Sequence, residues 1–266
     1  MKVIELDILV KFAEYCDKHN LRYYLYAGTL LGAVRHQGFI PWDDDIDVVM
    51  PRPDYERFLT LTLDDPVSDH IDVLSSRTSD DRIFPFMKLV DSRTDGHEAY
   101  LDEKFHNGIW IDVFPLDGVP EDITERKKFI ANQQKDIKRL SHCNRTIVFT
   151  WNPLKLAKRT MIYLLYYRAS SRGIAARLEA NARKYSYDDS RYIGVTAFCG
   201  GHNNVIEKAG FEDAVLLPFE GHNFKVPGTY KQYLSHLFGP DYMTPPPISK
   251  RTQAHLYTGW WKDGAQ

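Results

Sequence analysis

Apolar and polar residues recur along the chain with two different periods. Apolar positions spaced three and four apart predict amphipathic helices over residues 3–19, 53–63 and 229–238. Short apolar runs and strict alternation predict strands over residues 21–26, 45–50, 71–75, 83–90 and 108–115, and a strand pair over 219–226. The chain therefore contains both strands and helices, and we expect an α+β fold.

The middle of the chain has a different character. Helices rich in lysine and arginine are predicted over residues 121–144, 153–169 and 173–185. From Lys135 to Lys184, twelve basic residues face two acids, so this segment carries +10 and the rest of the chain −12, which sum to the net charge of −2. We therefore divide the chain into a core (residues 1–120), a basic helical insertion (121–190) and a C-terminal region (191–266) that packs back on the core.

The charge of the insertion predicts an anionic partner. Its second helix also carries a broad apolar and aromatic stripe, and a helix of this kind suits the surface of an anionic membrane. The alternative is an ordinary helical insertion whose cations are solvated. No segment resembles a known RNA-binding module, so nucleic acid is not an expected partner.

Composition limits the class of protein further. With 43% hydrophobic and 26% charged residues, the 266-residue chain is typical of a soluble globular protein. Cys16, Cys143 and Cys199 are scattered and odd in number, which suits a reducing compartment and argues against a disulfide framework. No apolar run is long enough to span a membrane, and acids interrupt the first apolar segment, so we expect a cytoplasmic protein without a signal peptide.

An acidic cluster interrupts this ordinary pattern. Four carboxylates fall within five residues: Asp43, Asp44, Asp45 and Asp47. If residues 45–50 form a strand, Asp45 and Asp47 share one face while Ile46 points into the core. Two carboxylates so close repel each other unless a cation neutralises them. Mg²⁺ binds carboxylates together with substrate phosphates, so the pattern predicts a magnesium site.

A calcium-binding EF-hand loop is the competing interpretation of these acids. It requires glycine at the sixth position and glutamate at the twelfth. The sequence has Val48 and Asp54 there, and two prolines fall inside the loop. We therefore reject an EF-hand.

Several residues near the cluster are candidates for binding phosphate. Gly28 and Thr29 form a predicted turn into a short helix over residues 29–35, where free backbone N–H groups can bind an anion. Arg35 could bind phosphate or be a solvated cation at the helix end. Trp42 could stack on a base or only fix its loop. Lys88 lies between apolar neighbours and needs an anion, unless its ammonium reaches solvent.

A strand, a Gly-Thr turn and a strand beginning Asp-Ile-Asp-Val resemble the nucleotidyltransferase motif Gly-[Gly/Ser]…Asp-h-[Asp/Glu]-h, where h is apolar and the second position here is threonine. The resemblance implies that fold's mixed β-sheet core flanked by helices, with a third carboxylate on a neighbouring strand. Asp112, a single acid within the apolar run of residues 108–115, is the best candidate, because adjacent strands lie only about 4.8 Å apart. Asp117 follows Pro115, precedes Gly118 and is interpreted as a turn residue.

Four longer blocks resemble the LicD family of phosphocholine transferases. They are AGTLLGAVRHQGFIPWDDDIDVVMPRPDYERF, which fukutin-type transferases share, FMKLVDSRT (86–94), WIDVFPLDGVP (110–120) and VPGTYKQYLSHLFGPDYMTPP (226–246). The resemblance implies Asp45, Asp47 and Asp112 as Mg²⁺ ligands and Asp112 or Asp43 as general base. The resemblance also favours substrate contact for Arg35. For Lys88, contact with a phosphate and an ammonium that reaches solvent both stay open.

The function that this resemblance implies is a Mg²⁺-dependent phosphotransferase. It would move phosphocholine from CDP-choline to a sugar hydroxyl of a cell-surface glycan or a lipid-linked teichoic acid precursor, and release CMP. Another CDP-alcohol (ribitol, glycerol or ethanolamine) is an alternative donor, and a nucleotidyltransferase releasing pyrophosphate is an alternative reaction. A choline- or glycan-binding protein is the non-enzymatic alternative, although the chain lacks repeated aromatic motifs.

Overall fold

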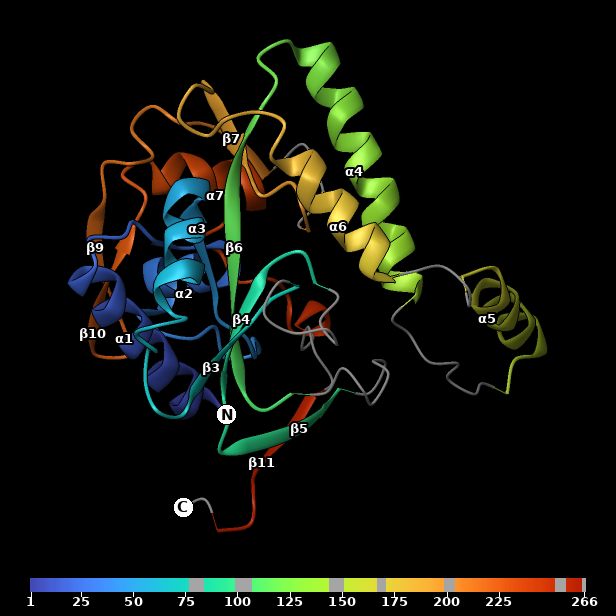
Figure 1. Cartoon of the computed structure of the whole chain (residues 1–266), viewed down its shortest axis with the longest axis horizontal. Helices are drawn as coiled ribbons and strands as arrows, with labels where there is room; N and C mark the ends of the chain where they lie inside the picture. The colour runs from blue at the N-terminus through green and yellow to red at the C-terminus, as the bar shows by residue number, and fades with distance from the viewer. Residues whose placement is uncertain are drawn as a thin grey trace.

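The computed structural model describes residues 1–76, 84–98, 107–143, 151–166, 171–198, 204–251 and 257–264 (Figure 1). The helices are α1 (Lys2–Lys18), α2 (Ala27–His36), α3 (Arg52–Leu61), α4 (Ile123–Cys143), α5 (Pro153–Tyr166), α6 (Ser171–Ala182), α7 (Tyr230–Phe238) and the 3₁₀ helix η3 (Ile248–Lys250). The strands are β1 (Tyr24–Leu25), β2 (Asp47–Pro51), β3 (Ile71–Leu74), β4 (Met87–Asp91), β5 (Thr94–Glu98), β6 (Trp110–Val119), β7 (Tyr192–Gly194), β8 (Val205–Glu207), β9 (Val215–Phe219), β10 (His222–Val226) and β11 (Tyr257–Trp261). The predicted α+β fold is confirmed.

The main sheet has the strand order β1-β2-β6-β4-β3, and β7 extends it by pairing with the far end of β6 and with β8. Strands β2 and β6 run parallel, whereas β1–β2, β3–β4, β4–β6 and β6–β7 are antiparallel. The sheet is therefore mixed, as predicted. Its long central strand, β6, is visible through the middle of the molecule (Figure 1).

One hydrophobic core joins the N-terminal helices, the sheet and the C-terminal elements. Helix α1 contacts β4 and β6, and α2 and α3 pack on β2. From the C-terminal region, β9 and α7 contact α2, and β10 contacts β1. Phe12, Val48, Ile111, Phe224 and Leu234, contributed by these different elements, are fully buried in the same cluster. Residues distant in sequence therefore hold the acidic segment in place.

The basic helices form a second layer with a small core of its own. Leu140 of α4 packs with Ile174, Ala175 and Leu178 of α6. Helix α5 contacts α4 and lies at the margin of the molecule (Figure 1). Among the described residues, none of the helices is both long and apolar enough to cross a bilayer.

The largest difference from the predicted elements concerns β6. The strand continues through Pro115 to Val119, so the prediction that Asp117 is a turn residue is wrong. Proline is tolerated in a strand where one side needs no ladder hydrogen bond. Pro115 meets this condition, because β4 pairs with β6 only as far as Val113 and β7 pairs with it only from Asp117 onward.

Smaller differences follow from contacts that local pattern does not encode. Strand β2 begins at Asp47 rather than at residue 45, so Asp45 lies in the preceding loop. Strand β1 covers only Tyr24–Leu25, and the hairpin β9–β10 begins at Val215 rather than at residue 219. The pairing of β5 with β11, more than 150 residues apart, was not predicted.

Candidate active site

Three polar side chains lie in a row across adjacent strands at the centre of the sheet. Asp47 of β2 is the register partner of Asp112 of β6, and Asp112 is in turn the partner of Lys88 of β4. Residues directly opposite in a sheet point to the same face, and their strands lie about 4.8 Å apart. Asp112 therefore lies beside Asp47, on the neighbouring strand where the sequence placed it. The roles of both as metal ligands stay a prediction.

Lys88 is buried with an anionic partner. Its Nζ lies 2.9 Å from Oδ1 of Asp112, and both residues are 8% exposed. The ammonium also lies 4.1 Å from the centre of the Trp110 ring and 5.1 Å from that of Phe84. The ion pair and the aromatic faces offset the cost of burying the cation. Asp112 is therefore the anion that pairs with Lys88, and contact between Lys88 and a substrate phosphate stays a prediction.

Three further carboxylates gather in the loop before β2. Asp43, Asp44 and Asp45 each offer an oxygen, and these oxygens lie within 4.8 Å of one another. Asp43 also lies against the start of α2, because a Cβ added to Gly28 would come within 2.5 Å of Asp43 Oδ2. Glycine at position 28 thus makes room for this carboxylate. The three acids form a compact set of hard oxygen donors, which fits a small divalent cation such as Mg²⁺.

The crowding of these acids alters their proton affinity. Burial raises the pKa of Asp43 to about 6, and the negative charges of Asp45 and Asp44 act in the same direction. The ammonium of Lys2 opposes them. A carboxyl group with a pKa in this range can accept and release a proton near neutral pH.

The N-terminus of α2 is held against the acidic strand. The Thr29 hydroxyl accepts a hydrogen bond from Asp47 N at 2.8 Å, and Tyr26 N donates to Asp47 O at 3.0 Å. Ala27 has a φ of 41°, an uncommon left-handed conformation for a residue with a Cβ. These contacts place Gly28, Thr29 and the first-turn N–H groups beside the carboxylates, where an anion can bind.

Arg35 and Trp42 lie near each other in the folded chain. Arg35 Nη1 donates to Tyr242 O at 2.8 Å, and its guanidinium carbon is 5.9 Å from the centre of the Trp42 ring. Burial lowers the pKa of Arg35, and the charge of Arg251 lowers it further. Both predicted substrate-binding residues thus lie near one another, and Trp42 directly precedes Asp43 in the chain.

Glu5 is a member of this region that the sequence analysis missed. It lies on α1, is 3% exposed, and its Oε2 has no hydrogen-bond partner among the described residues. Burial raises its pKa to about 8, the charges of Asp45 and Asp44 raise it too, and the N-terminal ammonium and Lys2 oppose them. A buried carboxyl group thus lies close to the acidic loop. An acid on an amphipathic helix normally faces solvent, so the sequence carried no signal for it.

The raised pKa of Glu5 predicts a pH-dependent stability. Between its unfolded pKa of 4.5 and its folded pKa of about 8, the folded protein holds a proton that the unfolded chain releases. The free energy of unfolding therefore falls as the pH rises through this window. Glu5→Gln should remove that slope and stabilise the metal-free protein on the order of 2–4 kcal/mol at about pH 8, with little effect at about pH 5.

Urea unfolding in EDTA at the two pH values measures this effect. Glu14→Gln is the matched control, because Glu14 is exposed on the same helix and should leave the pH profile unchanged. Parallel profiles for the wild type and Glu5→Gln would contradict the burial of an uncompensated carboxyl group.

The sequence of the chain matches a known protein family. Residues 20–161, more than half of the chain, match the family LicD/FKTN/FKRP, nucleotidyltransferase domain. The chain is 29% identical over 271 aligned positions to the lipopolysaccharide cholinephosphotransferase LicD of Haemophilus influenzae, covering 96% of this chain and 94% of that protein. It is also 51% identical over 58 residues to an uncharacterized protein of Rickettsia typhi, covering 21% of this chain and 19% of that protein. The chain belongs to the LicD/FKTN/FKRP nucleotidyltransferase family.

Proposed function

We propose that the protein transfers phosphocholine from CDP-choline to a hydroxyl group of a cell-surface glycan or its lipid-linked precursor, and releases CMP. Its family membership, together with its similarity to a cholinephosphotransferase, makes it a phosphotransferase. The observation that carries the finer proposal is end-to-end similarity to a cholinephosphotransferase, combined with carboxylates on two adjacent central strands. Teichoic acid precursors and lipopolysaccharide are both acceptors of this class, and the proposed location is the cytoplasmic face of a membrane.

The acidic residues are the proposed magnesium site. Asp45, Asp47 and Asp112 would hold Mg²⁺, and the grouping of Asp43 and Asp44 with Asp45 supports a site with several oxygen donors. A bound magnesium ion neutralises the charge of a pyrophosphate and lowers the pKa of a coordinated hydroxyl group. Gly28 and Thr29 would bind a phosphate through backbone N–H groups at the start of α2.

Of the two candidate general bases, Asp43 is the better placed. Asp112 already directs Oδ1 to the Lys88 ammonium at 2.9 Å, so this oxygen is engaged with a cation. Asp43, whose carboxylate lies against the start of α2 within the acidic loop, would take the proton of an acceptor hydroxyl and return it to solvent. Asp112 would then orient the site and balance the charge of Lys88.

The products distinguish this function from its alternatives. With CDP-choline, Mg²⁺ and a sugar acceptor, we expect CMP and a choline phosphodiester in equal amounts. Pyrophosphate release from CTP would identify a nucleotidyltransferase, and turnover only with CDP-ribitol, CDP-glycerol or CDP-ethanolamine would identify a different donor. Binding of choline without turnover, unaffected by EDTA, would identify a binding protein.

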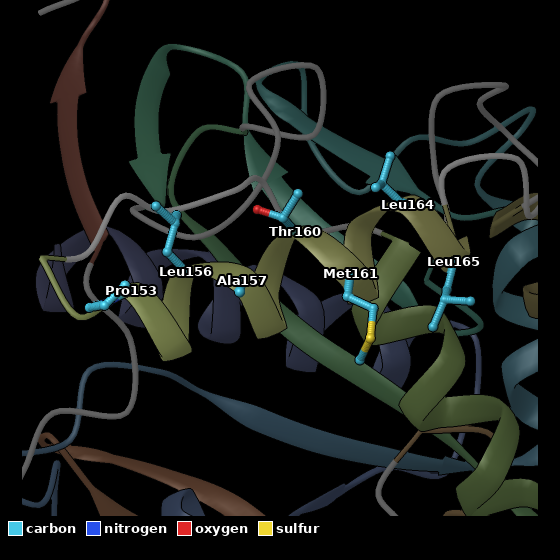
Figure 2. Close-up of a pocket in the computed structure, with 7 residues that line it drawn as sticks. All are labelled: Pro153, Leu156, Ala157, Thr160, Met161, Leu164 and Leu165. Carbon is cyan, nitrogen blue, oxygen red and sulfur yellow. The ribbon is translucent and has the colours of Figure 1, made fainter.

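Contact with an anionic membrane completes the proposal, and the surface of α5 supports it. Figure 2 shows one face of this helix, where Pro153, Leu156, Ala157, Thr160, Met161, Leu164 and Leu165 line an open apolar hollow. Leu154 is 81% exposed and Leu164 68% exposed. The helix contains Lys155, Lys158 and Arg159 but no acid. A short helix with an exposed apolar half and basic flanks is typical of membrane-surface binding.

Vesicle co-sedimentation tests this contact. The wild type should bind vesicles of phosphatidylglycerol and phosphatidylcholine, bind pure phosphatidylcholine weakly, and lose affinity at high salt. Leu164→Ser combined with Leu165→Ser should weaken vesicle binding about tenfold or more, because two leucines that enter the membrane contribute several kcal/mol to binding. Leu63→Ser is the control, since Leu63 is 71% exposed outside α5. Unchanged vesicle binding by the double variant would contradict membrane contact. So would a wild type that forms dimers in solution, if the double substitution abolishes those dimers.

A further inference from the structure

Two arginines from distant parts of the chain meet at the ring of Trp42. The guanidinium carbon of Arg251, which directly follows η3, lies 4.5 Å from the ring centre. That of Arg35, at the end of α2, lies 5.9 Å from the same point. Arg251 is separated from Trp42 by more than 200 residues, so the fold and not local sequence brings the cations together.

Neither cation is neutralised by the part of the protein that the structure describes. Within it, no carboxylate forms an ion pair with Arg35 or Arg251. Arg251 uses only Nε, which donates to Pro246 O at 2.9 Å, so both of its Nη groups have no hydrogen-bond partner among the described residues. The Nη2 group of Arg35 is equally unused within that set.

The two charges also repel each other. Both residues are half-buried. Burial is the larger cause of the lowered pKa of Arg35, and the charge of Arg251 is the second cause. Burial, and then the charge of Arg35, lower the pKa of the neighbouring His36, so a protonated His36 is disfavoured beside the two arginines. Like charges gathered on one aromatic ring are unfavourable unless an anion binds between them. Guanidinium groups present paired N–H donors that match the oxygens of a phosphate.

We propose that Arg35 and Arg251 form a phosphate clamp at Trp42, next to the acidic loop, that binds a phosphate group of a substrate. This inference rests on the proposed function and adds Arg251, a C-terminal residue, to the binding site. The clamp adjoins Asp43, since Trp42 and Asp43 are consecutive, so a phosphate held there lies near the proposed magnesium site. The phosphate could belong to the CDP-alcohol donor or to a phosphorylated acceptor, and the experiment separates them.

Calorimetric titration of wild type, Arg251→Gln, Arg251→Lys and Arg35→Gln with CDP-choline and with inorganic pyrophosphate tests the clamp. Loss of a charged hydrogen-bonding group should raise the Kd about tenfold or more for Arg251→Gln and Arg35→Gln, and less for Arg251→Lys. Lys250→Gln, which removes the same charge from an exposed neighbour, should change Kd less than about twofold.

Thermal unfolding separates binding from a structural role. If Arg251 only anchors the C-terminal segment through Pro246 and Trp42, Arg251→Gln should lower Tm in the absence of ligand and leave both Kd values unchanged, which would overturn the clamp. The clamp predicts instead an unchanged or higher ligand-free Tm, because repulsion with Arg35 is removed, and a smaller rise in Tm on adding pyrophosphate.

Steady-state kinetics identify the source of the phosphate. A raised KM for CDP-choline alone in Arg251→Gln assigns the clamp to the donor, and a raised KM for a phosphorylated acceptor alone assigns it to the acceptor. Wild-type values for both would overturn it while leaving the proposed function intact. Conversely, a wild type that binds pyrophosphate through Arg251 but never turns over CDP-choline would overturn the proposed function and keep the clamp.

Discussion

Asp45→Asn and Asp47→Asn should each reduce CMP release from CDP-choline by about a thousandfold or more while leaving the protein folded. Removing one carboxylate from a magnesium site weakens the charge stabilisation of the reacting pyrophosphate, and losses of this size follow when one strong electrostatic group is removed. In the metal-free protein Asp45→Asn relieves repulsion among Asp43, Asp44 and Asp45, and Asp47→Asn relieves repulsion with Asp112 on the neighbouring strand. The free energy of unfolding in EDTA should therefore stay equal or rise.

Two further measurements make the result specific to metal binding. Mg²⁺ should raise the Tm of the wild type and raise that of either variant much less. Asp72→Asn is the control, because Asp72 is an exposed acid on β3 and should keep full activity and the full Mg²⁺ effect. Wild-type turnover in Asp45→Asn or Asp47→Asn would remove these residues from the proposed site.

The sequence predicted best what depends on local pattern. A single acid inside an apolar run, as at Asp112, indicates a strand residue facing away from the core on a functional face, and the parallel pairing of β2 with β6 brings it opposite Asp47. The helices α1, α3 and α7 begin and end within about two residues of the predicted bounds, a normal uncertainty for helix ends.

The residues that were missed depend on contacts between distant segments. Glu5 has the spacing of a solvent-facing acid, but the fold buries it near enough to Asp44 and Asp45 for their charges to raise its pKa. Arg251 follows a proline-rich segment with no regular pattern, and its place at Trp42 is a tertiary contact. Periodicity reports which face of an element is apolar, but not which distant element covers the other face.

Asp117 also depends on a contact with a distant segment, because its partner Arg52 lies 65 residues away in the chain. Its carboxylate binds Arg52 with two hydrogen bonds, Nε to Oδ1 at 2.6 Å and Nη2 to Oδ2 at 2.8 Å. Asp117 is 1% exposed and Arg52 8% exposed. The guanidinium also donates to Glu56 at 3.2 Å and lies 3.8 Å from Glu179 of α6. This network joins β6, α3 and the basic helices, so its role is structural rather than catalytic.

Arg52→Met should therefore lower the free energy of unfolding by about 3–5 kcal/mol, because it leaves the Asp117 carboxylate buried without its cation. Arg52→Lys should recover only part of this loss, since an ammonium cannot form the paired hydrogen bonds. The double variant Arg52→Met, Asp117→Leu should be more stable than Arg52→Met alone, because no uncompensated charge stays buried.

Urea unfolding at constant pH measures all three variants. Arg191→Gln breaks an exposed pair with Glu207, in which the side chains are 57% and 48% exposed, and should cost less than about 1 kcal/mol. Because Arg52 also faces Glu179, its loss should increase amide hydrogen exchange in α6 more than in α1. A loss for Arg52→Met as small as that for Arg191→Gln would mean that water reaches Asp117, and that the basic helices are held to the sheet by other contacts.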